Sequence, residues 1–384
     1  MLTHFRLGFP GNHAQSIPYP SGGLDASSIP RKAPRQKALE SSMKPGTSQF
    51  TVGLLIGLLA ACATFAWLGQ RGSSGQPASG RVLTVAHALP VTHPVHQGLE
   101  EFAKQLAQLS GGTLTATIYP SEQLGNETEC LEKIQQGSID VTKVSAAPVG
   151  NFVPVFRLFS LPYLFRDHDH FWKTLDGPVG QDLLTALATT GDGGPSGIVG
   201  LTYYDAGSRS FYTTRPVTSP ADLAGLKIRV QQDPVAEDMV RAMGASAVAM
   251  AMGELYTSLK QGGVDGAENN PPSFHSSRHF EICKHYILDE HTSVPDVLVA
   301  SQNLWDSLNE TERGWVTEAA KRSSNLQREI WADASDQALA DLKAAGVTIR
   351  ETDPAAFREA AASVTAKYAT GERATMVERI QAVK

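Results

Sequence analysis

The feature that most constrains the fold is a regular alternation of strand and helix patterns. Residues 82–89 are predicted to form a strand, and residues 96–109 carry apolar side chains at the spacing of one helix face. Alternating apolar residues indicate a half-buried strand at 114–118, and a helix near 127–135 and a strand at 139–144 follow. Strands that alternate with helices in this way form parallel sheets, so the sequence predicts a βαβαβ unit.

The alternation resumes in the second half of the chain and is followed by a long helix. Residues 198–204, 211–214 and 226–230 are predicted strands. Asp233, which precedes a proline, indicates the N-cap of a further helix. Residues 310–345 are predicted to form one helix, roughly 50 Å long at 1.5 Å per residue. The chain is therefore predicted to be an α/β protein of two lobes, with a long C-terminal helix that spans both.

The N-terminal part of the chain has a different character. Residues 1–49 are rich in Pro, Gly and Ser and lack hydrophobic periodicity, which predicts a disordered segment or a misassigned start. Residues 50–69 contain an uncharged apolar run, typical of a signal peptide or a membrane anchor. The motif LAAC within it resembles a lipobox, with Cys62 as the lipidated residue. Cleaved signal, lipoprotein and retained anchor all export the rest of the chain, which is joined by a linker at 70–80.

Composition and missing motifs exclude several classes of function. The formal net charge is −6 and no basic cluster occurs in the folded part, so we expect no nucleic-acid partner. The motifs HExxH, GxSxG, GxxxxGKS/T and a strand-linked GxGxxG are absent, and we expect no cofactor. The alternating Asp and His residues at 167–170 are more typical of a solvated loop than of metal ligands, so no metal site is predicted.

Two groups of polar residues are candidates for a site. Arg229 lies on a predicted strand that is otherwise made for burial, so it needs an anionic partner, either a ligand or a structural ion pair. His87, His93 and His96 flank the first strand–helix turn, at the sheet edge where ligands bind in α/β folds. These histidines can equally be helix caps or surface residues.

Several motifs occur in a fixed order along residues 82–375. They include HALPVTHPVHQGLEEFA, YPSEQLGNETECLEKIQQGSIDVT, LPYLFRD, PVTSPADLAGLKIRV, MGELYTSLKQGGVDGAENN and FEICKHY. Together they resemble the periplasmic solute-binding proteins of tripartite ATP-independent periplasmic (TRAP) transporters, the DctP family. The resemblance implies a periplasmic-binding-protein-like fold with a hinge, in a solute-binding domain at 81–375. Lobe I is expected at about 81–205 with part of the C-terminal region, and lobe II at about 206–290.

The resemblance also implies a set of ligand contacts. Arg229 is expected to bind the ligand carboxylate through its planar fork, with Arg209 as a second arginine. The remaining expected contacts are Asn269, Asn270, Met252, Tyr204, His93 and His96, with Met252 in a position where many members have a phenylalanine. For each of these, a place in the core or at the rim is the alternative.

Function follows from the same resemblance. We expect a receptor in the Gram-negative periplasm, free or tethered to the inner membrane through residues 50–68, that delivers an organic acid to TRAP permease subunits. The polar groups of Asn269, Asn270 and the histidines favour a sugar acid, a hexuronate or aldonate. The alternatives are a C4-dicarboxylate read by both arginines, an exported sugar-acid-processing enzyme, and a sensor domain.

The exported domain has two cysteines, Cys130 and Cys283, in an oxidising compartment. We expect a disulfide between them, with two separate buried thiols as the alternative.

Overall fold

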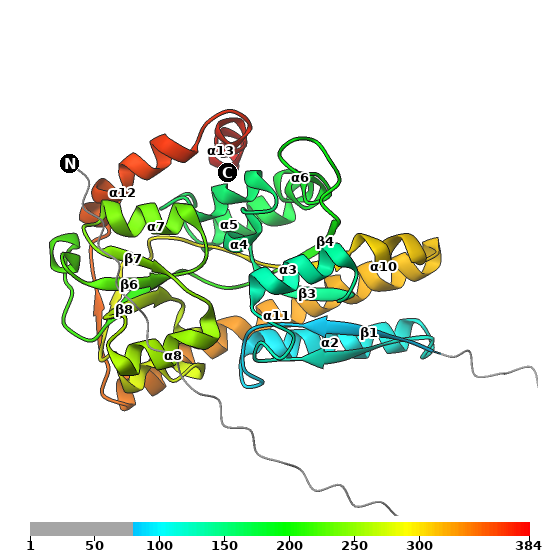
Figure 1. Ribbon diagram of the computed structural model, residues 1–384, viewed down its shortest axis with the longest axis horizontal. Helices are drawn as coiled ribbons and strands as arrows, with labels where there is room; N and C mark the ends of the chain where they lie inside the picture. The colour runs from blue at the N-terminus through cyan, green and yellow to red at the C-terminus, as the bar shows by residue number, and fades with distance from the viewer. Residues whose placement is uncertain (1–79) are drawn as a thin grey trace, which may run out of the picture. The chain divides into compact units, whose positions relative to one another are not determined.

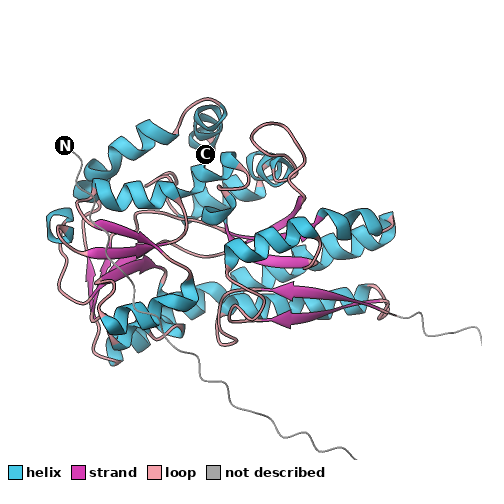
Figure 2. Ribbon diagram, viewed as in Figure 1, coloured by secondary structure: helices cyan, strands magenta, loops and turns pink. Residues whose placement is uncertain are grey.

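The computed structural model describes residues 80–384, which form two mixed β-sheets flanked by helices (Figures 1 and 2). The segments expected at 1–49, 50–69 and 70–79, and the expected lipidation at Cys62, lie outside the described residues. Within the described part of the chain, no helix combines the length and the apolar character needed to cross a membrane.

The five-stranded sheet, with its helices, is called lobe I. Its strands, in spatial order, are β2 (Leu114–Tyr119), β1 (Arg81–Ala86), β3 (Val141–Ser145), β10 (Asp296–Ser301) and β4 (Ile198–Tyr204). Its helices include α2 (Pro94–Leu109), α3 (Glu127–Gln136), α4 (Ala146–Val149), η1 (Pro154–Ser160), α5 (His168–Asp176), α6 (Pro178–Ala186) and α10 (Gln302–Ser307).

The six-stranded sheet, with its helices, is called lobe II. Its strands are β11 (Thr348–Glu351), β9 (His285–Leu288), β5 (Ser210–Thr213), β8 (Gly266–Asn269), β6 (Lys227–Val230) and β7 (Ser246–Ala249). The helices that follow or join these strands are η2 (Pro220–Leu223), α7 (Pro234–Ala242), α8 (Met252–Gln261), α9 (Pro271–Ser276), η3 (His279–Glu281) and α12 (Ala355–Tyr368). The last helix, α13 (Glu372–Ala382), packs against η1 and α6 of lobe I.

The βαβαβ unit predicted in lobe I is present. Strand β1 pairs in parallel with β2 and β3, and α2 and α3 form the two crossovers. Asn126 begins α3 with a capping box, and Gly137 ends the helix in the left-handed conformation. Strand β10 was not predicted and lies antiparallel between β3 and β4, so the sheet is mixed.

The long helix α11 (Glu310–Ala344) connects the two lobes. Asn309 caps its start with a capping box, and Gly346 lies just beyond its end with φ +81°. Its first half packs against α2 and β4 of lobe I, where Ala319 and Ala320 join the hydrophobic core. Leu342, near the other end, packs into the core of lobe II, and the helix also contacts α9. The predicted architecture of two α/β lobes spanned by a long C-terminal helix is therefore confirmed (Figure 1).

The chain also passes between the two sheets at 205–209, after β4, and at 289–295, before β10. The side chain of Gln327 on α11 binds the first of these connections through both backbone groups of Asp205, at 2.7 Å to its N–H and 2.9 Å to its carbonyl. The first connection between the lobes is thus tied to the helix that spans both of them.

The expected disulfide is not formed, because both cysteines are free and buried in different lobes. Cys130 lies on α3 in lobe I, and its thiol donates toward the carbonyl of Gly125 at 3.3 Å. Cys283 packs in the core of lobe II. The two thiols belong to separate hydrophobic clusters, which is the alternative stated above.

Candidate ligand-binding cleft

A cavity lies where residues of both lobes and of their connections meet. It encloses about 430 Å³ of space free of atoms, part of it open to solvent. Its position fits an α/β binding site, since β3, β6 and β8 each place their carboxyl ends there. The lining consists of Ala88, Leu89, Glu127, Lys143, Ser145, Ala206, Arg209, Arg229, Gln231, Met252, Asn269, Asn270, Ser273, Val294 and Asp296.

Arg229, from β6 of lobe II, brings a positive charge to the cavity that the surrounding protein does not neutralise. The residue is only 3% exposed. Its Nε donates to the carbonyl of Met250 at 2.8 Å, while Nη1 is buried without a hydrogen-bond partner. Among the described residues, no carboxylate lies within ion-pair distance of Arg229, and burial lowers the pKa of its guanidinium. A buried cation in this state is suited to receive an anion.

Arg209 lines the same cavity but already has its counter-ion. Its Nε and Nη2 bind both carboxylate oxygens of Glu268, with Nη2 to Oε1 at 2.9 Å. Burial raises the pKa of Glu268, but the guanidinium of Arg209 and the neighbouring His291 outweigh burial and lower it to about 2. Arg209 and Glu268 therefore form a buried structural ion pair on the cavity wall. The hypothesis that both arginines receive ligand carboxylates is not supported by this geometry.

The two expected asparagines have different surroundings. The amide oxygen of Asn269 accepts from Arg209 Nη1 at 3.0 Å, while its Nδ2 has only the sulfur of Met252, at 4.0 Å. Asn270 uses both of its amide groups within the protein, because it donates to the Ala206 carbonyl and accepts from Ser273 N–H at the start of α9. The Asn269 amide thus offers a donor to the cavity, whereas Asn270 holds the connection between the lobes.

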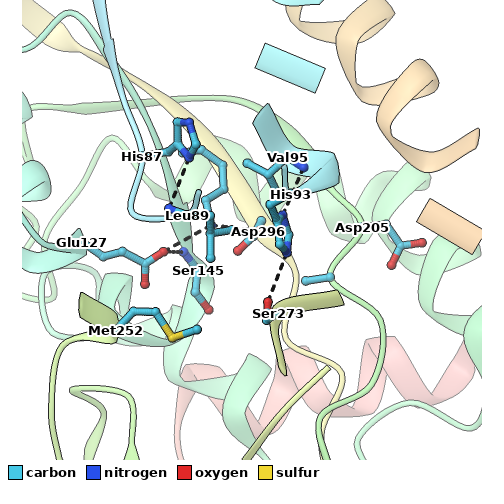
Figure 3. Close-up of polar contacts among 12 residues, drawn as sticks. His87, Leu89, His93, Val95, Glu127, Ser145, Asp205, Met252, Ser273 and Asp296 are labelled. Carbon is cyan, nitrogen blue, oxygen red and sulfur yellow. Dashed lines mark hydrogen bonds and ion pairs between the residues drawn. The ribbon is translucent and has the colours of Figure 1, made fainter. Parts of the chain in front are cut away.

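His93 and His96 are not among the residues that line the cavity. His93 caps α2 by accepting from Val95 N–H at 3.2 Å, and its Nε2 lies 3.2 Å from Ser273 Oγ (Figure 3). His96 Nδ1 lies 3.0 Å from His87 Nε2. Burial lowers the pKa of His87 to about 3 and that of His93 well below its usual value, so both rings are neutral at physiological pH. The capping alternative applies to His93, which also supports Ser273 from lobe I.

Tyr204 points away from the cavity. It is fully buried in the lobe I core, where its hydroxyl donates to Ser323 Oγ on α11 at 2.8 Å. The end of β4 packs against α11, so alternation along this strand directs Tyr204 to the helix. Asp205, next along the chain, pairs with His168 at 2.8 Å. The expectation that Tyr204 lines the ligand wall is therefore wrong in this structure.

Three charged residues of the lining, all from lobe I, were not predicted from the sequence. Lys143, on β3, lies 3.0 Å from Asp296 on β10 and 3.3 Å from Glu127 at the start of α3. Glu127 also accepts from the backbone N–H of Ser145 at 2.9 Å (Figure 3). Burial lowers the pKa of Lys143, but the two carboxylates outweigh burial and raise it. The signal was present in the strand VTKVS, where one lysine interrupts a buried run.

Contacts at the rim join the two lobes. Thr128 of lobe I donates to the side chain of Gln232 at 2.7 Å, and Asn151 donates to the Gln232 carbonyl at 2.7 Å. Glu122 of lobe I accepts from the backbone N–H of Gly253, in the first turn of α8, at 3.1 Å. Since α8 has no side-chain cap of its own, Glu122 of lobe I supplies an acceptor for its first turn.

The Asp and His residues at 167–170 have structural roles. Asp167 caps α5 by accepting from His170 N–H at 2.7 Å, and His170 Nε2 contacts the carbonyl of Ile380 at 2.9 Å. Within residues 80–384 no group of three metal-ligating side chains is gathered.

Comparison with known proteins gives consistent similarities. The profile of bacterial extracellular solute-binding protein family 7, DctP, matches residues 85–371. A TRAP periplasmic solute-binding protein from Pseudomonas putida F1, solved with bound D-glucuronate, is 37% identical with a TM-score of 0.76, over 79% of this chain and 98% of that one. One from Bradyrhizobium sp. BTAi1, in complex with D-galacturonate, is 40% identical with a TM-score of 0.74, over 78% of this chain and 99% of that one. The C4-dicarboxylate-binding periplasmic protein DctP of Rhodobacter capsulatus is 30% identical over 70% of this chain and 79% of its own length.

Proposed function

We propose that this chain, which belongs to the DctP family of periplasmic solute-binding proteins, is a receptor for a monocarboxylic sugar acid, a hexuronate or an aldonate. The receptor delivers this ligand to the membrane permease subunits of a TRAP transporter. The family binds solutes rather than transforming them, so the alternative of an exported enzyme is set aside.

The observation that carries the proposal is the single unpaired guanidinium in the cavity. Arg229 is buried, makes one hydrogen bond to protein and has no carboxylate partner among the described residues. A carboxylate accepts two parallel N–H···O bonds from such a fork and neutralises its charge. Of the three cations in the lining, Arg209 is paired with Glu268 and Lys143 with two lobe I carboxylates, which leaves Arg229 to bind one ligand carboxylate.

The other polar residues of the lining can form hydrogen bonds with hydroxyl groups of the ligand. Asn269, Gln231 and Ser145 bring amide and hydroxyl groups to the wall, and these can donate to and accept from hydroxyls. The relatives with bound D-glucuronate and D-galacturonate are similar over nearly their whole length, which supports the same ligand class here. A C4-dicarboxylate needs a second free cation, which the geometry of Arg209 does not offer.

A ligand panel tests the proposal. Thermal unfolding is followed with D-glucuronate, D-galacturonate, D-erythronate, succinate and malate, and hits are measured by calorimetry. A ligand present at one hundred times its Kd adds about 2.7 kcal/mol to the free energy of unfolding. We expect stabilisation by at least one sugar acid and not by the dicarboxylates. Stabilisation by succinate or malate with no response to any sugar acid overturns the proposal.

A further inference from the structure

We propose that the lobe I charge cluster, formed by Glu127, Lys143 and Asp296, binds the ligand hydroxyls and excludes ligands with a second carboxylate. This inference rests on the function proposed above, and it names residues that decide which acids the cleft accepts.

The cluster is assembled from three elements of one lobe. Glu127 begins α3, Lys143 lies within β3, and Asp296 begins β10, so the three side chains meet at one edge of the lobe I sheet. Lys143 is 2% exposed and Asp296 is 5% exposed, yet all three residues line the cavity. A buried group of charges at a cavity lowers the stability of the folded protein unless its remaining hydrogen-bonding capacity is used.

The charges of the cluster do not cancel. Two carboxylates share one ammonium. Burial raises the pKa of Asp296 and the neighbouring Lys143 opposes this shift, so when both carboxylates are ionised lobe I has an excess of one negative charge on its side of the cavity. Arg229 of lobe II is the unpaired positive charge on the other side. Closing the lobes therefore places a cationic wall and an anionic wall around one small volume. A ligand that carries a carboxylate at one end and hydroxyls at the other is complementary to both walls.

The hydrogen-bonding capacity of the cluster suits hydroxyl donors. An ionised carboxylate only accepts, and each carboxylate has more acceptor positions than its contacts with Lys143 and Ser145 occupy. Lys143 uses two of its three N–H groups on Glu127 and Asp296, so one remains to donate to a ligand oxygen. Vicinal hydroxyls, each both donor and acceptor, match this set.

The same cluster opposes a dicarboxylate. A second ligand carboxylate would lie against Glu127 and Asp296, and the cluster's own cation, Lys143, is already shared between them. Repulsion between like charges at close range disfavours a dicarboxylate, so the cluster selects against it while it binds a sugar acid with one carboxylate.

Two isosteric variants and one control test the inference by calorimetry, with D-glucuronate and succinate as probes. Glu127→Gln and Asp296→Asn each remove one negative charge while keeping the side-chain shape and leaving Lys143 one carboxylate partner. Glu132→Gln, at an exposed position of the same helix, makes the same charge change away from the cavity. We expect both cluster variants to lose roughly tenfold or more in D-glucuronate affinity and to gain measurable succinate binding. Glu132→Gln should match the wild type with both probes.

The outcomes separate the two proposals. The inference alone is overturned if both cluster variants bind D-glucuronate as tightly as the wild type does and still do not bind succinate. Wild-type protein that binds no sugar acid overturns the proposed function and the inference together. Circular dichroism and thermal unfolding establish that each variant folds, and either variant alone decides the question. If neither folds, wild-type protein that binds succinate as tightly as D-glucuronate still overturns the inference.

Discussion

Replacing Arg229 with lysine tests how the cleft holds its carboxylate. Lysine keeps the positive charge but replaces a planar fork with a single ammonium, so the two parallel hydrogen bonds are lost. Disrupting one side of a buried charge pair of this kind weakens binding by about 2 kcal/mol or more. At about 1.4 kcal/mol per factor of ten, this is roughly a thirtyfold rise in Kd. Arg229→Met, which removes the charge, should weaken binding further.

The same substitutions should leave the protein folded. Arg229 makes one hydrogen bond to protein, to the Met250 carbonyl, and has no ion pair among the described residues. Losing that bond costs about 1 kcal/mol, and removing an uncompensated buried charge offsets part of it. Arg209→Met is the matched contrast, because it leaves Glu268 buried without its guanidinium. This variant should lose about 3–5 kcal/mol in the free energy of unfolding.

Calorimetry with the identified ligand and urea unfolding of each variant decide between these roles. Near wild-type affinity of Arg229→Lys would show that another group holds the carboxylate. Destabilisation of Arg229→Met as large as that of Arg209→Met would show that Arg229, like Arg209, belongs to a structural ion pair.

Three further predictions concern residues outside the charge balance of the cleft. Tyr204→Phe removes the hydrogen bond to Ser323, so urea unfolding should show a loss of about 1 kcal/mol in the free energy of unfolding. Calorimetry should show unchanged ligand affinity, and weakened binding would indicate that Tyr204 contacts the ligand. His87 has its pKa lowered from 6.5 to about 3, so the unfolded state binds a proton first as the pH falls, and stability should drop between pH 6.5 and 3. His87→Gln should reduce that drop in thermal unfolding followed against pH, and an identical pH profile would contradict the assignment. Alkylation after denaturation without reductant, read by peptide mass spectrometry, should label both Cys130 and Cys283, and an unlabelled linked pair of peptides would establish a disulfide.

Local patterns predicted most of the secondary structure because they depend on neighbours in the sequence. The N-cap at Asp233, for example, depends on backbone groups within one turn. Strand β10 was missed because a continuous apolar run does not reveal which strands it will join. It pairs antiparallel with β3 and β4, and these contacts span more than ninety residues of sequence.

A site residue could be predicted from the sequence only where a charged side chain interrupts an otherwise apolar strand. Arg229 stood out on a buried strand, and the structure places it in the cavity with no ionic partner among residues 80–384. Lys143 gave the same signal and was overlooked. The status of Arg209 could not be read locally, because its partner Glu268 is brought to it by pairing of β5 and β8. Tyr204 depended on which face of β4 meets α11, and this is settled only by tertiary packing.

For the proposed receptor, we expect ligand capture and lobe closure to be coupled through Arg229. In this structure the rim contact of Glu122 with Gly253 is formed, and the guanidinium of Arg229 is buried with one protein acceptor. Closure without an anion therefore gains a few hydrogen bonds and loses much of the hydration of a cation, whereas closure on a carboxylate gains the same bonds and a neutralised pair. A ligand shifts a two-state equilibrium only by its difference in affinity for the two states. Because Arg229 is buried in the closed state, we expect the ligand carboxylate to bind that state more tightly than the open one. The rim contacts need only be weak, since stronger ones would close the cleft before the ligand enters.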